Sequence, residues 1–308
     1  MPMLYASGIM HSGSYGYALG GNTGSVSLVA DCTTFATRTT AALASANLSQ
    51  ARHVLVAMSD CVLYGYALGG YVTGNPGVAT ADCTTFATRT TAALASANLS
   101  LVRGYLAAMS DGKLYGYALG GYNGSLLYVA DCTTFATRTT AALASANLSF
   151  ARNHVFAMSD GARFGYTMGG NAYVATADCT TFATRTTAAL ASANLSQARG
   201  DAGAMSDCVL YGYALGGTNG GNVATADCTT FATQATAALA SANLSIARQG
   251  LSATSDGSGY GYALGGSTGS VSLVADCTTF ATRTTAALAS ANLSLARSGI
   301  AAMSDGNV

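Results

Sequence analysis

Hydrophobic and polar positions recur along this chain with a period of about 50 residues. A short hydrophobic run ends in a glycine pair six times, beginning at residues 20, 69, 120, 169, 216 and 265, so the spacings are 49, 51, 49, 47 and 49 residues. A block of nearly constant sequence follows each pair, from Ala30 to Ser49 in the first copy, and only the fifth copy departs from it, at Gln234 and Ala235. Such self-similarity is typical of repeat architectures. We expect one domain over residues 1-308, with six equivalent units at about 1-50, 51-101, 102-150, 151-197, 198-246 and 247-297, and a closing strand at 298-305.

Each unit is predicted to contain four short strands. In the second copy they cover Val54–Met58, Tyr64–Leu68, roughly Val78–Phe86 and roughly Thr90–Ala95. An Asp-Gly turn in three other copies supports a hairpin between the first two strands. The segment AALASAN could instead form a short helix, but its leucines are five residues apart and make no helical stripe, so a strand followed by a loop is preferred.

The second strand alternates bulky and very small residues. Its large side chains point to one side and its small ones to the other, because side chains alternate across a strand. A bulky face on one sheet can then pack densely against the small face of the next sheet. In the second copy the large residues are Tyr64, Tyr66 and Leu68, and the small ones are Gly65, Ala67 and Gly69.

Charge is scarce, and this scarcity narrows the function. Charged residues make up 8% of the chain and the net charge is zero, whereas an average domain has about 25% charged residues. We therefore expect no nucleic-acid partner. No apolar run is long enough to span a membrane, and the N-terminus shows no ordinary signal peptide. The repetitive Ala, Thr and Ser composition favours an extracellular or virion surface.

The order of features within a unit resembles the kelch repeat. A loop ends in Ala51-Arg52, and an apolar strand, an Asp-containing turn and a Tyr-rich strand ending in Gly-Gly follow it. The resemblance implies an all-β, six-bladed β-propeller of four-stranded antiparallel blades. Two features mark a divergent branch: the chain has no tryptophan, and Ala51 stands where kelch repeats tend to have proline.

The C-terminal segment after Arg297 repeats the first strand of a unit. The N-terminal segment Leu4–Met10 has the same phase but is degenerate. We expect the C-terminal strand to close the ring. The alternative is that this strand pairs with a neighbouring molecule and drives self-assembly.

Cysteines and histidines are the candidates for covalent or metal chemistry. Six cysteines occupy equivalent positions in different units, too far apart for disulfides, and are expected to behave as small buried side chains. Cys61 and Cys208 replace a turn glycine, and each could pair within its own unit, with Cys83 and Cys228. The three histidines do not converge, so we expect no metal, no cofactor and no enzymatic activity.

Two sets of arginines recur at fixed places, together with aspartates of the Asp31 and Asp60 type. In so uncharged a chain we expect structural ion pairs that connect loops between blades; an anion site on the axis is the alternative. The first set is Arg52, Arg103, Arg152, Arg199, Arg248 and Arg297, and the second is Arg38, Arg89, Arg138, Arg185 and Arg283.

The copies differ mainly in two places, the five residues after the first-set arginine and the loop between the second and third strands. Recognition commonly resides in loops held by a rigid scaffold, although these positions could also simply be free to drift. The candidate ligand-binding residues in the first place are His53, Asn153 and His154. Those in the second are Tyr71, Asn75, Tyr122, Asn123, Tyr173, Asn219 and Asn222.

These observations favour a non-enzymatic structural or binding module, such as a surface, fibre or virion component. Its partner would be a protein or a glycan, on the loop face or in the central channel. A glycan-binding lectin is an alternative in which tyrosine would supply the aromatic platform. A propeller-based hydrolase or oxidase is disfavoured, because no copy carries a distinctive set of polar residues.

Overall fold

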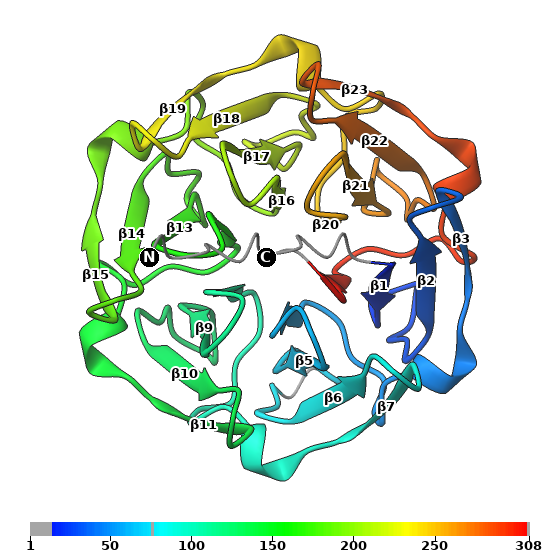
Figure 1. Ribbon diagram of the computed structural model, residues 1–308, viewed down its shortest axis with the longest axis vertical. Helices are drawn as coiled ribbons and strands as arrows, with labels where there is room; N and C mark the ends of the chain where they lie inside the picture. Colours follow the sequence, from blue (N-terminus) through cyan, green and yellow to red (C-terminus); the bar gives the residue numbers. More distant parts are fainter. Residues whose placement is uncertain (1–13, 75–76, 307–308) are drawn as a thin grey trace, which may run out of the picture.

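A computed structural model describes residues 14–74 and 77–306. Six four-stranded antiparallel sheets are arranged in a ring around a central axis, which makes the fold a six-bladed β-propeller (Figure 1). The prediction of the fold class is therefore confirmed. The described part of the chain contains no helix long and apolar enough to cross a membrane.

Each blade runs from an inner strand at the channel to an outer strand at the rim. The inner strands are β4 (Val56–Ser59), β8 (Ala107–Ser110), β12 (Phe156–Ser159), β16 (Gly203–Ser206), β20 (Ser252–Ser255) and β24 (Ala301–Ser304). The second strands are β1 (Tyr15–Leu19), β5 (Tyr64–Leu68), β9 (Tyr115–Leu119), β13 (Phe164–Met168), β17 (Tyr211–Leu215) and β21 (Tyr260–Leu264).

The third and outer strands follow, and a single turn of 3-10 helix then leads to the next blade. The third strands are β2 (Ala30–Thr34), β6 (Ala81–Thr85), β10 (Ala130–Thr134), β14 (Ala177–Thr181), β18 (Ala226–Thr230) and β22 (Ala275–Thr279). The outer strands are β3 (Thr39–Ala42), β7 (Thr90–Ala93), β11 (Thr139–Ala142), β15 (Thr186–Ala189), β19 (Ala235–Ala238) and β23 (Thr284–Ala287). The 3-10 turns are η1 (Ala44–Ala46), η2 (Ala95–Ala97), η3 (Ala144–Ala146), η4 (Ala191–Ala193), η5 (Ala240–Ala242) and η6 (Ala289–Ala291).

The predicted strand boundaries need three corrections. The inner strand of the second blade begins at Val56 rather than Val54, and its third strand begins at Ala81 rather than Val78. The fourth strand ends at Ala93, and the residues after it form the 3-10 turn η2. The segment AALASAN therefore begins in the fourth strand, as expected, and continues as a 3-10 turn rather than an open loop, because the chain passes to the next blade within a few residues.

The C-terminal strand closes the ring, as predicted. Strand β24 pairs with β1, with Met303 opposite Tyr17, and so becomes the inner strand of the first blade (Figure 1). It is therefore not a spare strand. The segment Leu4–Met10 lies outside the described residues.

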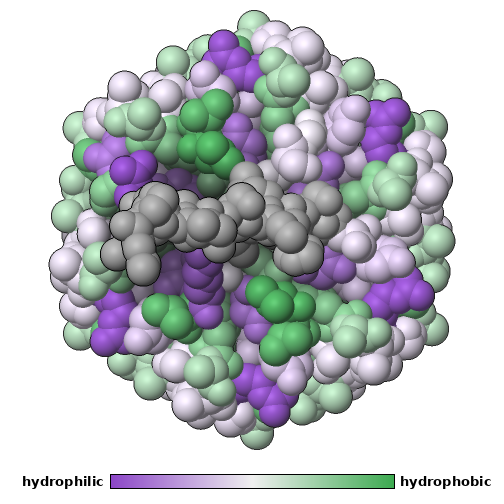
Figure 2. Space-filling view, in the orientation of Figure 1, coloured by the Kyte–Doolittle hydropathy of each residue, from purple (hydrophilic) through white to green (hydrophobic). Residues whose placement is uncertain are grey.

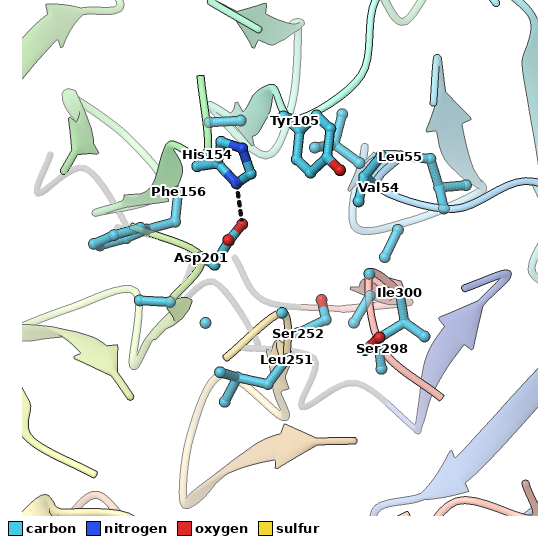
Figure 3. A pocket seen from close by; sticks show the side chains of 18 of the residues that line it. Val54, Leu55, Tyr105, His154, Phe156, Asp201, Leu251, Ser252, Ser298 and Ile300 are labelled. Carbon is cyan, nitrogen blue, oxygen red and sulfur yellow. Dashed lines mark hydrogen bonds and ion pairs between the residues drawn. The ribbon is translucent and has the colours of Figure 1, made fainter. Parts of the chain in front are cut away.

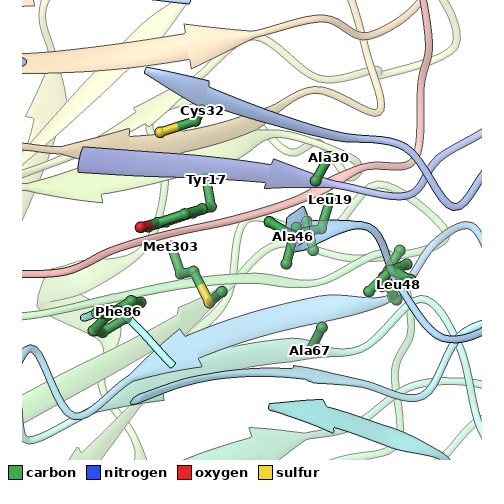
Figure 4. Packing of buried hydrophobic residues seen from close by; sticks show 11 residues of the cluster. Tyr17, Leu19, Ala30, Cys32, Ala46, Leu48, Ala67, Phe86 and Met303 are labelled. Carbon is green, nitrogen blue, oxygen red and sulfur yellow. The ribbon is translucent and has the colours of Figure 1, made fainter. Parts of the chain in front are cut away.

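Neighbouring blades pack as the alternation of large and small residues predicted. The ring of Tyr66 stacks on that of Phe135 in the next blade, with ring centroids 5.6 Å apart. A Cβ atom added to Gly116 would lie 2.3 Å from Sδ of Met58 in the preceding blade. Figure 4 shows the equivalent contact between the first two blades, where Met303, Tyr17 and Phe86 pack together.

Six buried ion pairs fix each blade near its entry point. Arg103 Nη2 lies 2.9 Å from Asp131 Oδ2, and both side chains are inaccessible to water. The same guanidinium donates to the carbonyl oxygen of Ala118. The other pairs are Arg52–Asp82, Arg152–Asp178, Arg199–Asp227, Arg248–Asp276 and Arg297–Asp31.

The second arginine set and the Asp60-type aspartates do not form the expected ion pairs with each other. Asp60 Oδ1 instead accepts hydrogen bonds from the backbone N–H groups of Val62, Leu63 and Tyr64 in the turn after the inner strand. The second-set arginines lie over tyrosine rings, at 4.8 to 4.9 Å from the centroid, in the pairs Arg38–Tyr260, Arg89–Tyr15, Arg138–Tyr64, Arg185–Tyr115 and Arg283–Tyr211. Cation–π contacts thus connect adjacent blades where ion pairs were expected.

The eight cysteines, all of which lie in the described part of the chain, form no disulfides. Burial raises the pKa of the Cys32 thiol to about 11, so it is a poor nucleophile at neutral pH. Cys61 and Cys208 occupy left-handed turn positions, with φ of 60° and 58°, and the Cys61 Sγ lies 3.4 Å from Ser59 Oγ. The alternative pairings Cys61–Cys83 and Cys208–Cys228 are therefore absent.

The face with the turns between inner and second strands carries separate apolar patches. Figure 2 shows them in green, interrupted by polar side chains. The most exposed large apolar residues at these turns are Val62, Leu63, Leu114, Val209 and Leu210.

Candidate functional site

The central channel widens into a cavity of about 380 Å³ at the end where the inner strands begin. A smaller cavity of about 120 Å³ lies at the other end. A ring of six alanines, one from each inner strand, lies at the narrow part of the channel between the two cavities. All six border the larger cavity, and all except Ala57 also border the smaller one: Ala57, Ala108, Ala157, Ala204, Ala253 and Ala302.

The larger cavity opens through a ring of six residues that we call the mouth ring: Val54, Tyr105, His154, Asp201, Gly250 and Gly299. Each follows a buried first-set arginine by two positions. Each donates its backbone N–H to the carbonyl oxygen of the ring residue in the preceding blade. The N···O distances, in chain order from Val54 to Gly299, are 2.7, 3.0, 2.9, 3.0, 2.8 and 2.8 Å. The hydrogen bonds therefore form a closed circle around the mouth.

All six mouth-ring residues have a left-handed backbone. Their φ values, in the same order, are 46°, 55°, 55°, 53°, 61° and 61°. In this conformation the N–H and C=O groups of one residue point to opposite neighbours, as the closed circle requires. Glycine adopts the conformation without strain, whereas other residues pay about 1–2 kcal/mol. Two blades use glycine, and four carry side chains in spite of this strain.

Three of these side chains gather on one side of the cavity. His154 Nδ1 lies 2.7 Å from Asp201 Oδ1, and the Tyr105 ring centroid lies 4.0 Å from that of His154. The His154 and Asp201 side chains are 27% and 25% exposed. Figure 3 shows the three together, with Ser298 and Ile300 across the cavity, where the mouth ring has glycine. The open half leaves room for a ligand beside the polar half.

An aromatic row extends from these side chains along the mouth. Tyr71 lies between Tyr105 and His53, with centroid distances of 5.8 and 6.2 Å, and its hydroxyl donates to the carbonyl oxygen of Tyr122. Burial lowers the pKa of His53, so its neutral form is favoured. Burial, and then the negative charge of Asp201, raise the pKa of Tyr105, so it stays a neutral phenol.

Asp201 differs from every other acid in the chain. Six of the thirteen aspartates pair with buried arginines. Six others belong to the Asp60-type turns, at positions 60, 111, 160, 207, 256 and 305. Asp201 is the remaining aspartate. The described cavity lining contains no lysine or arginine, so the histidines are its only side chains that could carry a positive charge.

The structure brings some of the predicted binding residues together. His53 and His154 line the cavity, and Tyr71 packs between His53 and Tyr105. In five of the six blades the residue after the glycine pair forms a backbone bridge to a residue just before the inner strand, as Tyr71 does with His53. Asn222 Nδ2 donates to the carbonyl oxygen of Ser267 nearby.

Other predicted residues lie elsewhere. Asn153 is buried, and it is not among the residues that line the cavity. Asn123, Tyr173 and Asn219 are exposed on loops. Asn75 lies outside the described residues.

Tyr105 and Asp201 were not among the predicted residues. The sequence does contain a signal for them: the position two after each first-set arginine is occupied by Val, Tyr, His, Asp, Gly and Gly in an otherwise nearly uniform repeat.

Neither protein-family models nor curated protein sequences give a match to this chain. Among the described residues no group of three or more His, Cys, Asp or Glu side chains could hold a metal ion. The fold and the site together define a six-bladed β-propeller with a partly polar cavity at one end of its channel.

Proposed function

We propose that this protein is a non-enzymatic binding module that holds a small ligand in the mouth of its channel. The observation that carries the proposal is the mouth ring, where four side chains persist at strained backbone positions that glycine fills elsewhere in the same ring. Strain of this kind concentrates at functional sites. The cavity volume of about 380 Å³ lies within the usual range for small-molecule sites, about 300–1,000 Å³.

The kelch-like order of features and the low charge support a surface or extracellular scaffold that presents this site. A lectin is the form of this proposal in which the ligand is a sugar. Tyr105, which lines the cavity, would then supply the aromatic surface.

Acid–base catalysis is a second candidate, because a carboxylate that holds Nδ1 of a histidine is also the orienting pair of hydrolytic triads. The labelled serines Ser252 and Ser298, however, lie across the cavity from His154 in Figure 3. Neither of these two serines is placed to act as a nucleophile activated by His154, and binding accounts for the arrangement more simply.

The test uses a triple variant in which Tyr105, His154 and Asp201 are replaced by glycine, the residue that Gly250 and Gly299 already supply in two other blades. A library of amines, acids, polyols and sugars is screened by ligand-observed NMR against both proteins. We expect compounds that bind the native protein and not the triple variant, while the triple variant stays folded, because relief of strain offsets the lost contacts. If every bound compound binds both proteins equally, or if the triple variant unfolds, the three side chains have a structural role and the proposal fails.

A further inference from the structure

We propose that the ligand in the channel mouth is a small organic cation whose ammonium or guanidinium group pairs with Asp201. This inference rests on the proposed function and names the class of compound that the same site takes. It is argued from the charge of the mouth, the aromatic surface beside it and the shape of the cavity.

Asp201 has no arginine or lysine partner among the described residues. Its contact with His154 Nδ1 leaves the carboxylate charge uncancelled wherever the imidazole is neutral. His154 is the only hydrogen-bonding partner that the described residues give this carboxylate. In contrast, Asp60 receives three backbone N–H groups and Asp131 a buried guanidinium.

The walls of the cavity strengthen the effect of this charge. The ring of alanines and the apolar residues above it, such as Leu55 and Ile300, line the deeper part. A charge in a cleft with low-dielectric walls attracts counter-ions more strongly than one on an open surface. An anionic ligand would meet this carboxylate with no lysine or arginine in the described lining to balance it.

Tyr105 supplies an aromatic surface at the mouth. It lines the cavity beside the His154–Asp201 pair, with its ring centroid 4.0 Å from that of His154. Tyr71 is buried and packs against Tyr105, so Tyr105 is the tyrosine that the ligand can reach. A tyrosine ring attracts cations through its quadrupole. A carboxylate next to this ring is thus suited to an ammonium or guanidinium group.

The shape of the cavity limits the remainder of the ligand. Gly250 and Gly299 leave two of the six mouth-ring positions without a side chain, and the channel then narrows towards the small side chains of the alanine ring. A cation with a short apolar tail would place its charge at Asp201 and its tail in the channel. A macromolecular chain would not fit in about 380 Å³.

The experiment compares three compounds of the same shape at pH 8: phenethylamine, the neutral 2-phenylethanol and the anionic 3-phenylpropanoate. Their dissociation constants are measured by NMR titration with the native protein, the Asp201→Asn variant and the triple variant. Tyr173→Ala is the matched control, because Tyr173 is an exposed tyrosine that does not line the cavity. If Asp201→Asn fails to fold, Asp201→Gly replaces it, since two blades already carry glycine there.

We expect phenethylamine to bind at least tenfold more tightly than 2-phenylethanol. Asp201→Asn should remove this preference, and Tyr173→Ala should leave it unchanged. Equal binding of the amine and the alcohol, with both lost in the triple variant, would overturn the cation inference and leave the proposed function standing. Tighter binding of the anion, or no binding of the amine, would overturn the inference as well. If the amine does not bind, the ligand-observed NMR screen of the compound library determines separately whether the mouth binds any other ligand.

Discussion

His154 Nδ1 lies 2.7 Å from Asp201 Oδ1, although 47 residues separate them in the chain. The contact joins two adjacent blades at equivalent positions of the repeat. The next two positions of the mouth ring are glycines with nearly the same backbone conformation. The fold therefore requires no side chain at these two positions. Substitutions of His154 and Asp201 can for this reason test their contribution to binding separately from their contribution to stability.

Replacement of Asp201 by glycine should change stability little while it removes the preference for the amine over the alcohol. Loss of the contact with His154 costs about 0.5–1.5 kcal/mol, and removal of a left-handed non-glycine residue returns about 1–2 kcal/mol. We expect the free energy of unfolding, measured by urea denaturation, to stay within about 1 kcal/mol of the native value. Gly250→Ala is the opposite control, because it introduces strain at φ 61° and should destabilise. A loss of several kcal/mol in Asp201→Gly would indicate a structural role for the pair.

Gly116→Ala should destabilise the contact between the second and third blades. Its Cβ would lie 2.3 Å from Met58 Sδ, and overpacking of this kind costs about 1–3 kcal/mol. Met58→Ala alone creates a cavity, but in the double variant the new methyl group occupies part of it. We therefore expect the double variant to lose less stability than the sum of the single ones, by at least about 0.5 kcal/mol. Strictly additive losses in thermal or urea unfolding would show that the two residues do not oppose each other.

How far the sequence predicts this fold depends on the residue type at each position. Tyr64–Leu68 was predicted with its observed bounds, because alternation of tyrosine and glycine is a direct signature of a strand between a bulky and a small face. The start of the inner strand was misplaced at Val54, because a β-branched residue rarely adopts positive φ. Only closure of the whole ring, with Val54 donating to Gly299, imposes that conformation.

The sequence predicted where the candidate site lies, but not all of the residues that form it. Variation after each first-set arginine led to His53 and His154 at the channel. Asp201 was overlooked, because its position outside the two repeated aspartate sites does not by itself reveal its surroundings: the other twelve carboxylates meet arginines or backbone N–H groups, and Asp201 meets His154. Those relations depend on how six blades align, which a single repeat does not encode.

Thr254→Met should stabilise the sixth blade. The other five blades have methionine at this position: Met58, Met109, Met158, Met205 and Met303. Thr254 Oγ1 is buried and makes no hydrogen bond with the described residues, which disfavours the native state. Methionine would remove this hydroxyl and pack against Gly16, and we expect a gain of about 1 kcal/mol in urea unfolding. Thr254→Ser keeps the hydroxyl and should give no gain; an equal gain from both variants would contradict this explanation.

His53 should make the protein less stable at acidic pH. Burial lowers its pKa in the folded state, so protonation favours the unfolded chain, whose histidine has a pKa of about 6.5. The stabilisation is complete above about pH 6.5 and is lost as the pH falls below that value towards the folded pKa. We expect His53→Gln to show a shallower loss of unfolding free energy between pH 7 and pH 5 than the native protein. Parallel pH profiles for the two proteins would mean that His53 does not titrate differently on folding.

The two arginine sets should respond very differently to neutralisation, although both recur in nearly every blade. Asp131→Asn leaves the Arg103 charge, which is inaccessible to water, without its counter-charge, and removal of one partner from a buried pair costs about 3–5 kcal/mol. Arg138→Gln removes a cation–π contact with Tyr64, and the fifth blade already carries Gln234 at the equivalent position. We expect this second variant to lose less than about 1 kcal/mol. Urea unfolding of the two variants decides the matter: similar losses would show that the cation–π contacts hold the blades together as firmly as the buried ion pairs do.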